Sequence, residues 1–143
     1  MKPIRAIGIV NGGGDAPGLN PIIRAIVRDG MNEHGMHVIG IRNDFDGLTW
    51  PEGAKEMTKE SVCRILPRGG SPTPFDRILG TRFGVAATDL VAKQQFRRMV
   101  CLKAGKMESV SLDEALKKMK YIDPSSEIVH AAPAIGTTFG DSA

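Results

Sequence analysis

"IRAIGIVNGGGDAPGLNPIIRAIVRDGMNEHGMHVIGIR", residues 4–42, is the stretch that decides the fold of this chain. Its two ends, residues 4–10 and 36–42, are short apolar runs rich in isoleucine and valine, a composition typical of buried strands. Apolar residues between them recur at helical spacing, Asn20 and Pro21 suit an N-cap and a first turn, and Gly35 suits the helix end. Two strands joined by one helix predict a βαβ unit with parallel strands and a right-handed crossover.

The rest of the chain shows weaker patterns, which predict shorter elements. Residues 43–57 are rich in turn-forming side chains, and we expect them to be irregular. Amphipathic spacing predicts a helix over residues 75–95, despite Gly80 and Gly84. The further predicted elements are a short helix after Thr58, two short strands around Gly105, a helix over residues 112–120 opened by a Ser111–Glu114 capping box, and a short helix after residues 123–127.

The composition fits one globular domain and indicates neither a nucleic-acid partner nor a membrane partner. The 143 residues are 41% apolar and 5% aromatic, with a net charge of +3. The basic residues are scattered among 16 acidic ones, which indicates solvated surface rather than a nucleic-acid interface. No stretch approaches the roughly 20 apolar residues of a membrane span. Cys63 and Cys101 form no CxxC pair and no disulfide framework, so we expect reduced thiols in a soluble, cytoplasmic protein.

The three glycines at residues 12–14 lie where the first predicted strand gives way to a helix. Such a turn presents backbone N–H groups to an anion, and the missing Cβ lets phosphate oxygens approach them closely. Asp15 suits a role in holding the loop or in orienting a hydrated magnesium ion. The pattern matches neither GxxxxGK[ST] nor GxGxxG with an acidic residue closing the second strand. Two interpretations therefore stay open, a phosphate-binding loop and a tight structural turn.

Arg24 and Arg28 lie four residues apart and share one face of the first predicted helix. Solvated surface charge is the ordinary explanation of such a pair. Two adjacent guanidinium groups also suit a phosphate ligand. The pair is therefore a second candidate anion site, with both interpretations open.

Three stretches of this sequence resemble the 6-phosphofructokinase family. They are residues 7–30, which look like the family's opening motif, residues 68–90 ("RGGSPTPFDRILGTRFGVAATDL"), and residues 110–141, which are similar to the ending of its bacterial branch. The resemblance implies an α/β fold with a partial doubly wound, Rossmann-like parallel sheet. In that fold, residues 1–68 form the βαβ unit and residues 69–143 pack on it as one compact unit. The implied reaction is a step of glycolysis, phosphoryl transfer from ATP or pyrophosphate to fructose 6-phosphate with Mg²⁺.

The resemblance also implies roles for particular residues. Gly13, Gly14 and Asp15 match the family's donor-phosphate loop, with Gly14 at the position that meets the phosphoryl donor. Arg24 and Arg28 match the helix arginines that line an effector phosphate site in allosteric bacterial members.

The family's central region is missing from this chain. The family motifs GGDGS, TIDND and MGR occur nowhere in the 143 residues. In the family they serve magnesium and the donor phosphates, the catalytic base, and the sugar phosphate. A join through a shared Arg-Gly-Gly at residues 68–70 would delete this centre and leave Arg68 at the position of the sugar-phosphate arginine. We therefore assign no catalytic residue and no metal ligand.

Three hypotheses follow from this mixture of matches and losses. The first is a 6-phosphofructokinase by descent that is inactive alone, because a missing general base alone costs about 10²–10⁴-fold in rate. The second is a non-catalytic phosphate- or nucleotide-binding module, or an assembly partner of full-length subunits. The third is a deletion product without retained function. In each case, exposed sheet edges and apolar patches lead us to expect a homo-oligomer.

Overall fold

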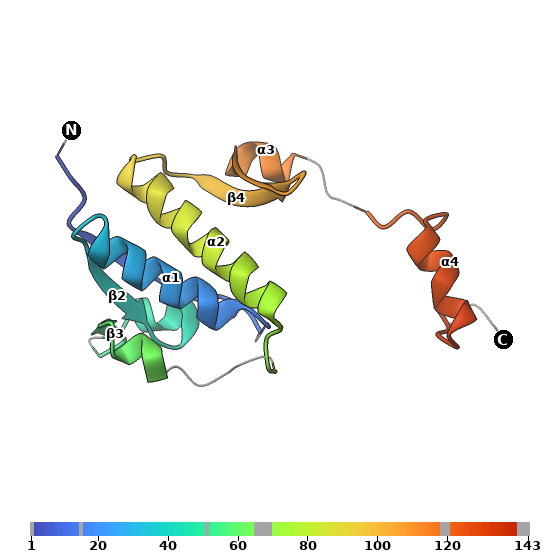
Figure 1. Ribbon diagram of the computed structural model, residues 1–143, viewed down its shortest axis with the longest axis horizontal. Helices are drawn as coiled ribbons and strands as arrows, with labels where there is room; N and C mark the ends of the chain where they lie inside the picture. Colours follow the sequence, from blue (N-terminus) through green and yellow to red (C-terminus); the bar gives the residue numbers. More distant parts are fainter. Residues whose placement is uncertain (1, 15, 51, 65–69, 118–120, 140–143) are drawn as a thin grey trace. The chain divides into compact units, whose positions relative to one another are not determined.

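The computed structural model describes residues 2–14, 16–50, 52–64, 70–117 and 121–139 (Figure 1). The chain divides into two compact units, Met1–Leu112 and Asp113–Ala143. The predicted boundary at residue 68 falls outside the described residues. Within the described ranges, no helix is both long enough and apolar enough to cross a bilayer.

A βαβ unit opens the first of these units, as the sequence predicts. It consists of β1 (Ala6–Ile9), α1 (Leu19–Asn32) and β2 (His37–Ile41). The two strands pair in parallel, and residue 6 lies opposite residue 37. The predicted α/β class with a parallel strand pair is therefore confirmed.

The start of α1 differs from the prediction. Gly18 is the N-cap instead of Asn20, and its φ of 91° lies in the left-handed region that glycine tolerates. Asn20 and Pro21 consequently lie inside the first turn, where backbone N–H groups need no partner within the helix. The end of α1 agrees with the prediction, because Gly35 follows it with a φ of 59°.

The segment after β2 contains a strand that the sequence analysis missed. This strand, β3 (Ala54–Glu56), pairs antiparallel with β2, so the sheet order is β1-β2-β3. Its three side chains are all exposed, so no alternation of apolar and polar residues marks it. Two 3-10 helices flank it, η1 (Asp44–Leu48) and η2 (Ser61–Arg64), and η2 stands where a short helix is predicted after Thr58.

The core joins α1 to the sheet and to η2. Val27 on α1, Val38 on β2 and Val62 on η2 are completely buried. The partly buried side chains that pack against these valines are Ile7, Ile9, Ile23, Met31 and Met57. This cluster fixes the helix against both parallel strands, and with them the two ends of the glycine loop.

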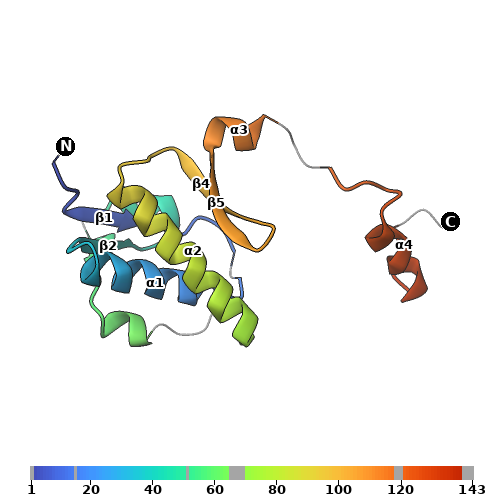
Figure 2. The ribbon, with the colours of Figure 1, turned by 45° about the horizontal axis from the view of Figure 1, so that its top comes forward.

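A long helix, α2 (Pro74–Ala92), packs alongside α1, as Figures 1 and 2 show. The contact depends on two glycines one helical turn apart. A Cβ at Gly84 would lie 2.6 Å from the Ala25 Cβ, and one at Gly80 would lie 2.7 Å from the Gly18 carbonyl oxygen. The predicted helix is confirmed, and its two glycines are what let the helices approach.

An antiparallel hairpin completes the first unit. It consists of β4 (Arg98–Lys103) and β5 (Lys106–Ser111), which contact α2. Ala104 and Gly105 join the strands with φ values of 48° and 77°, as the two central residues of a type I′ turn require. The two strands predicted around Gly105 are confirmed.

The remaining described helices are α3 (Leu112–Leu116), which starts at the last residue of the first unit, and α4 (Glu127–Ala134). Of residues 113–117 and 121–139, none with a described side chain is buried. The second unit therefore has helical structure without a core of its own among these residues.

Candidate phosphate-binding site

The glycine loop leaves β1 at its carboxyl end and leads into α1. Because β1 and β2 are parallel, the carboxyl end of β2 lies at the same edge of the sheet (Figure 2). Open α/β sheets bind their ligands at this edge. A hollow of about 630 Å³ opens here, lined by Asn11, Gly13, Ile41, Arg42, Asn43 and Asp44.

The loop glycines are open to solvent. A Cβ at Gly13 or Gly14 would meet no atom within 4 Å, and Gly13 has a φ of 133°. Gly12 differs, because a Cβ there would lie 2.7 Å from a ring carbon of Phe45. The loop therefore packs through its first glycine and leaves room beside the next two. Asp15, which the sequence analysis adds to this group, lies outside the described residues.

Arg42 and Asn43 are the site residues that sequence reasoning missed. They follow β2 directly, and the topology brings them to the hollow that Gly13 borders. The signal was available, since two parallel strands around one helix end at the same edge of the sheet. Arg42 supplies the positive charge that the glycine loop lacks. Asp44 adds a carboxylate to the same hollow, the ligand type that Mg²⁺ prefers.

A second hollow, of about 350 Å³, adjoins the first and is more apolar. Asn11, Ile41 and Arg42 line both. The second is also lined by Lys55 of β3, which adds another positive charge near Arg42, and by Ile9, Leu19, Asn20, Ile23, Gly40 and Met57. The carboxyl edge of the sheet thus presents two cations and an apolar wall beside an open glycine loop.

Arg24 and Arg28 lie elsewhere. Their guanidinium groups point toward η2, where Arg24 Nη2 donates to the Val62 carbonyl at 3.2 Å and Arg28 Nη2 lies 3.5 Å from Cys63 Sγ. Both line a separate groove of about 270 Å³ between α1 and α2. Neither arginine is among the described residues that line the hollow beside Gly13. Arg68 lies outside the described residues.

A parallel strand pair with a glycine loop at its carboxyl edge is the architecture of phosphate-binding α/β proteins. Residues 6–71 match the family model described as Phosphofructokinase. The resemblance to the 6-phosphofructokinase family that the motifs predict is therefore confirmed.

Two relatives show how much of such a protein this chain contains. It is 40% identical over 84 residues to "ATP-dependent 6-phosphofructokinase" of Spirochaeta thermophila, covering 59% of this chain and 23% of the relative. It is 43% identical over 83 residues to "ATP-dependent 6-phosphofructokinase 3" of Bacteroides thetaiotaomicron, covering 58% of this chain and 25% of the relative. The chain thus spans about a quarter of the length of the curated relatives it matches.

Solved structures of phosphofructokinases also match. The structure from Saccharomyces cerevisiae is 28% identical, with a TM-score of 0.40, over 62% of this chain and 12% of that one. The T-state structure from Pichia pastoris is 23% identical, with a TM-score of 0.42, over 68% of this chain and 14% of that one.

Proposed function

We propose that this chain is a 6-phosphofructokinase by descent, which binds the phosphate groups of that enzyme's ligands but does not transfer a phosphoryl group on its own. The observation that carries the proposal is the hollow at the carboxyl edge of the sheet, where Gly13 and Arg42 lie together. The family of residues 6–71 supplies the ligand class.

Each part of this edge suits a part of a phosphoryl donor such as ATP or pyrophosphate. Open glycines let phosphate oxygens reach the backbone N–H groups of Gly13 and Gly14. The Arg42 guanidinium can donate two parallel hydrogen bonds to a phosphate group. We assign to Asp44 and Asp15 the role of binding the water shell of Mg²⁺.

The inactivity follows from what phosphoryl transfer requires. The reaction depends on positioning and charge stabilisation by several groups at once. The family's motifs for magnesium, for the catalytic base and for most of the sugar-phosphate site are absent from the sequence. Arg68 is the sugar-phosphate contact that we retain in the proposal. Arg24 and Arg28 remain candidates for an effector phosphate, since a ligand could replace their present contacts with η2.

Calorimetric titration tests the binding half of the proposal. We expect the full chain to bind MgATP or magnesium pyrophosphate, and the difference between these two arms identifies the donor. Arg42→Ala should weaken binding about tenfold or more, because a hydrogen bond to a charged group contributes roughly 1.5–3 kcal/mol. Arg5→Ala is the matched control, since Arg5 precedes β1 at the opposite edge of the sheet. No heat of binding with either donor, or an equal loss of affinity in Arg42→Ala and Arg5→Ala, would refute the site.

An aldolase-coupled assay tests the inactivity. With fructose 6-phosphate, Mg²⁺ and either donor, we expect product formation at the background rate. Turnover that scales with the concentration of this chain and disappears in Arg42→Ala would show that the chain is a working enzyme.

Self-association is the second part of the proposal, together with a cytoplasmic location. Large apolar side chains are exposed on the first unit, among them Phe45, Phe75 and Ile78, each more than 60% exposed. Apolar surface of this kind favours association with a second copy. Light scattering after size-exclusion chromatography should show a mass that rises with protein concentration, and a constant monomer mass would contradict this part.

A further inference from the structure

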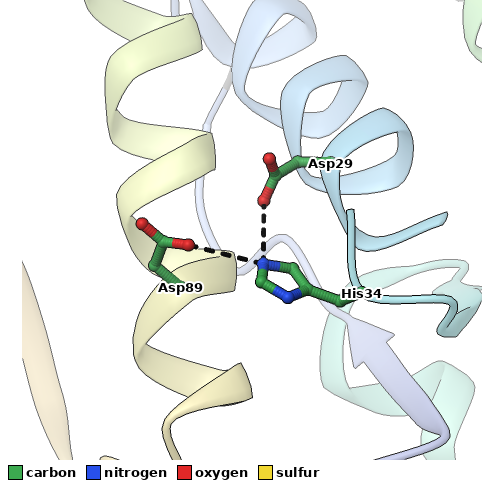
Figure 3. A group of neighbouring side chains, drawn as sticks. All are labelled: Asp29, His34 and Asp89. Atoms are coloured by element: carbon green, nitrogen blue, oxygen red, sulfur yellow. Dashed lines mark ion pairs between the residues drawn. The ribbon is translucent and has the colours of Figure 1, made fainter. Parts of the chain in front are cut away.

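Three potential metal ligands converge on one point in the first unit, away from the glycine loop (Figure 3). Asp29 lies on α1, His34 lies just beyond the end of that helix, and Asp89 lies on α2. The Nε2 atom of His34 is 3.6 Å from Asp29 Oδ2 and 3.4 Å from Asp89 Oδ1. The imidazole nitrogen therefore stands between two carboxylates from different helices.

Two of these atoms lack hydrogen-bond partners. Asp29 Oδ2 and His34 Nε2 are shielded from solvent, and in the described part of the chain neither makes a hydrogen bond. The separations of 3.4 and 3.6 Å exceed the 2.7–3.2 Å of a good N–H···O bond. A shielded polar atom without a hydrogen bond is costly, and a bound cation would satisfy both atoms.

Another histidine of the same unit shows the contrast. His37 Nδ1 lies 2.8 Å from Glu56 Oε1, and both side chains are mostly exposed. That pair is a direct hydrogen bond on the surface, with a length that needs nothing between the two atoms. The nitrogen–oxygen distances around His34, 3.4 and 3.6 Å, are therefore longer than the 2.8 Å of the His37–Glu56 pair.

The two separations from His34 Nε2 to the carboxylate oxygens fit ligands of a tetrahedral ion. Zinc binds imidazole nitrogen and carboxylate oxygen at about 2.0–2.2 Å, and tetrahedral geometry then separates neighbouring ligand atoms by about 3.3–3.6 Å. One imidazole and two carboxylates are a set that suits zinc, whereas Mg²⁺ prefers six oxygens. A three-ligand set leaves a fourth position for water.

The charge of the cluster points the same way. Two carboxylates lie beside one imidazole, and a divalent cation would carry the charge opposite to theirs.

We infer that Asp29, His34 and Asp89 form a binding site for a divalent transition-metal ion of the zinc type, which links the end of α1 to α2. The link joins the segment that matches the phosphofructokinase model, residues 6–71, to a helix outside that segment. The ion would link two helices that already lie close together at Gly80 and Gly84. It is separate from the magnesium that accompanies a phosphoryl donor.

The test begins with the full chain after treatment with a chelator. Calorimetric titration with Zn²⁺ should show one saturable site, and the melting temperature should rise with metal concentration, because the folded state binds the ion. Replacement by Co²⁺ should give visible absorption bands of a tetrahedral nitrogen and oxygen site. Near-ultraviolet bands of a cobalt–thiolate bond would instead assign the ion to the free Cys63 or Cys101 and overturn the inference.

Substitutions identify the ligands. His34→Gln and Asp89→Asn should each weaken metal binding at least about tenfold, since even residues that only orient a ligand cost 10–100-fold. His37→Gln is the matched control and should bind as the unchanged chain does. Asp89 is 45% exposed, so its variant should fold even where His34→Gln does not. Absence of saturable binding, or unchanged affinity in Asp89→Asn, would overturn the site.

Discussion

The two units of the chain differ in what holds their helices in place. In Met1–Leu112, α1 packs on the sheet through Val27, which is 0% exposed. In Asp113–Ala143, Leu116 and Ile135 are 81% and 83% exposed, and no described residue with a described side chain is buried. The helix α4 has only 8 residues, and isolated helices shorter than about 12–15 residues are marginal in water. The contrast teaches that burial, rather than local helix signals, separates the stable part of this chain from the rest.

A pair of alanine substitutions, one in each unit, tests this difference with the largest expected effect. Val27→Ala should lower the free energy of unfolding by about 2–3 kcal/mol, because it removes two buried carbon atoms and leaves a cavity. Leu116→Ala removes a larger side chain, yet it should change that free energy by less than about 0.5 kcal/mol. Urea unfolding followed by circular dichroism measures both. Equal losses would mean that the second unit contributes a core.

The contact between α1 and α2 gives the next largest effect. Gly84→Ala should destabilise by about 1–2 kcal/mol, because its Cβ would lie 2.6 Å from the Ala25 Cβ and 2.7 Å from the Ile22 carbonyl oxygen. In an open helix the same change would stabilise by up to about 1 kcal/mol, so the sign of the change is diagnostic. Thr81→Ala, at an exposed position of α2, is the control. A gain in stability for Gly84→Ala would show that the helices do not pack closely there.

These two glycines also show why the sequence predicted the elements better than their assembly. Periodicity predicted both helices, yet the buried residues of α2 are Gly80, Gly84 and Thr88 and not its large apolar side chains. Gly80 and Gly84 then counted only as weak points of a helix, although their spacing of one turn is what a close helix contact needs. A partner helix some 50 residues away leaves no mark in local pattern. The strand β3 was missed for a related reason, since only pairing with β2 makes its three exposed residues a strand.

The candidate phosphate site shows the same division. The run of three glycines between a predicted strand and a predicted helix indicated either a phosphate loop or a tight turn, and the family resemblance then singled out Gly13 and Gly14. Arg42 was not predicted, because its relevance comes from the parallel pairing that brings the end of β2 beside the loop. The cluster of Asp29, His34 and Asp89 depends on the packing of two helices, so the spacing of these residues in the sequence does not predict it.

The N-cap of α2 gives a smaller effect. The Thr73 hydroxyl accepts from the Asp76 N–H at 3.2 Å, and the Asp76 carboxylate accepts from the Thr73 N–H at 2.8 Å, which together form a capping box. Thr73→Ala should cost about 1 kcal/mol of the free energy of unfolding. Thermal unfolding measures this, with Thr81→Ala again as the control. No loss in Thr73→Ala would mean that the start of α2 is held by packing alone.

The same cap predicts a dependence on pH. Hydrogen bonds from the side chain and the backbone of Thr73 lower the pKa of Asp76 below its usual 3.8. A lowered pKa in the folded state adds stability above the usual pKa, and this contribution is lost as the pH falls through the lowered value. The melting temperature of the unchanged chain should therefore exceed that of Asp76→Asn at pH 7, and the difference should shrink toward pH 2. A constant difference would show that the carboxylate charge contributes nothing.

The smallest expected effect sharpens the comparison between the two units. Removal of residues 113–143 should change the free energy of unfolding of the remaining unit by less than about 0.5 kcal/mol, because the described side chains of that segment bury nothing. Hydrogen exchange on the full chain tests the same difference in stability between the two units. Amides of α4 should exchange at nearly unprotected rates, whereas those of α1 should open only with global unfolding. Amide protection in α4 that disappears in the Val27→Ala variant would mean that one cooperative core holds both units. Burial within the first unit would then no longer explain the stability of that unit.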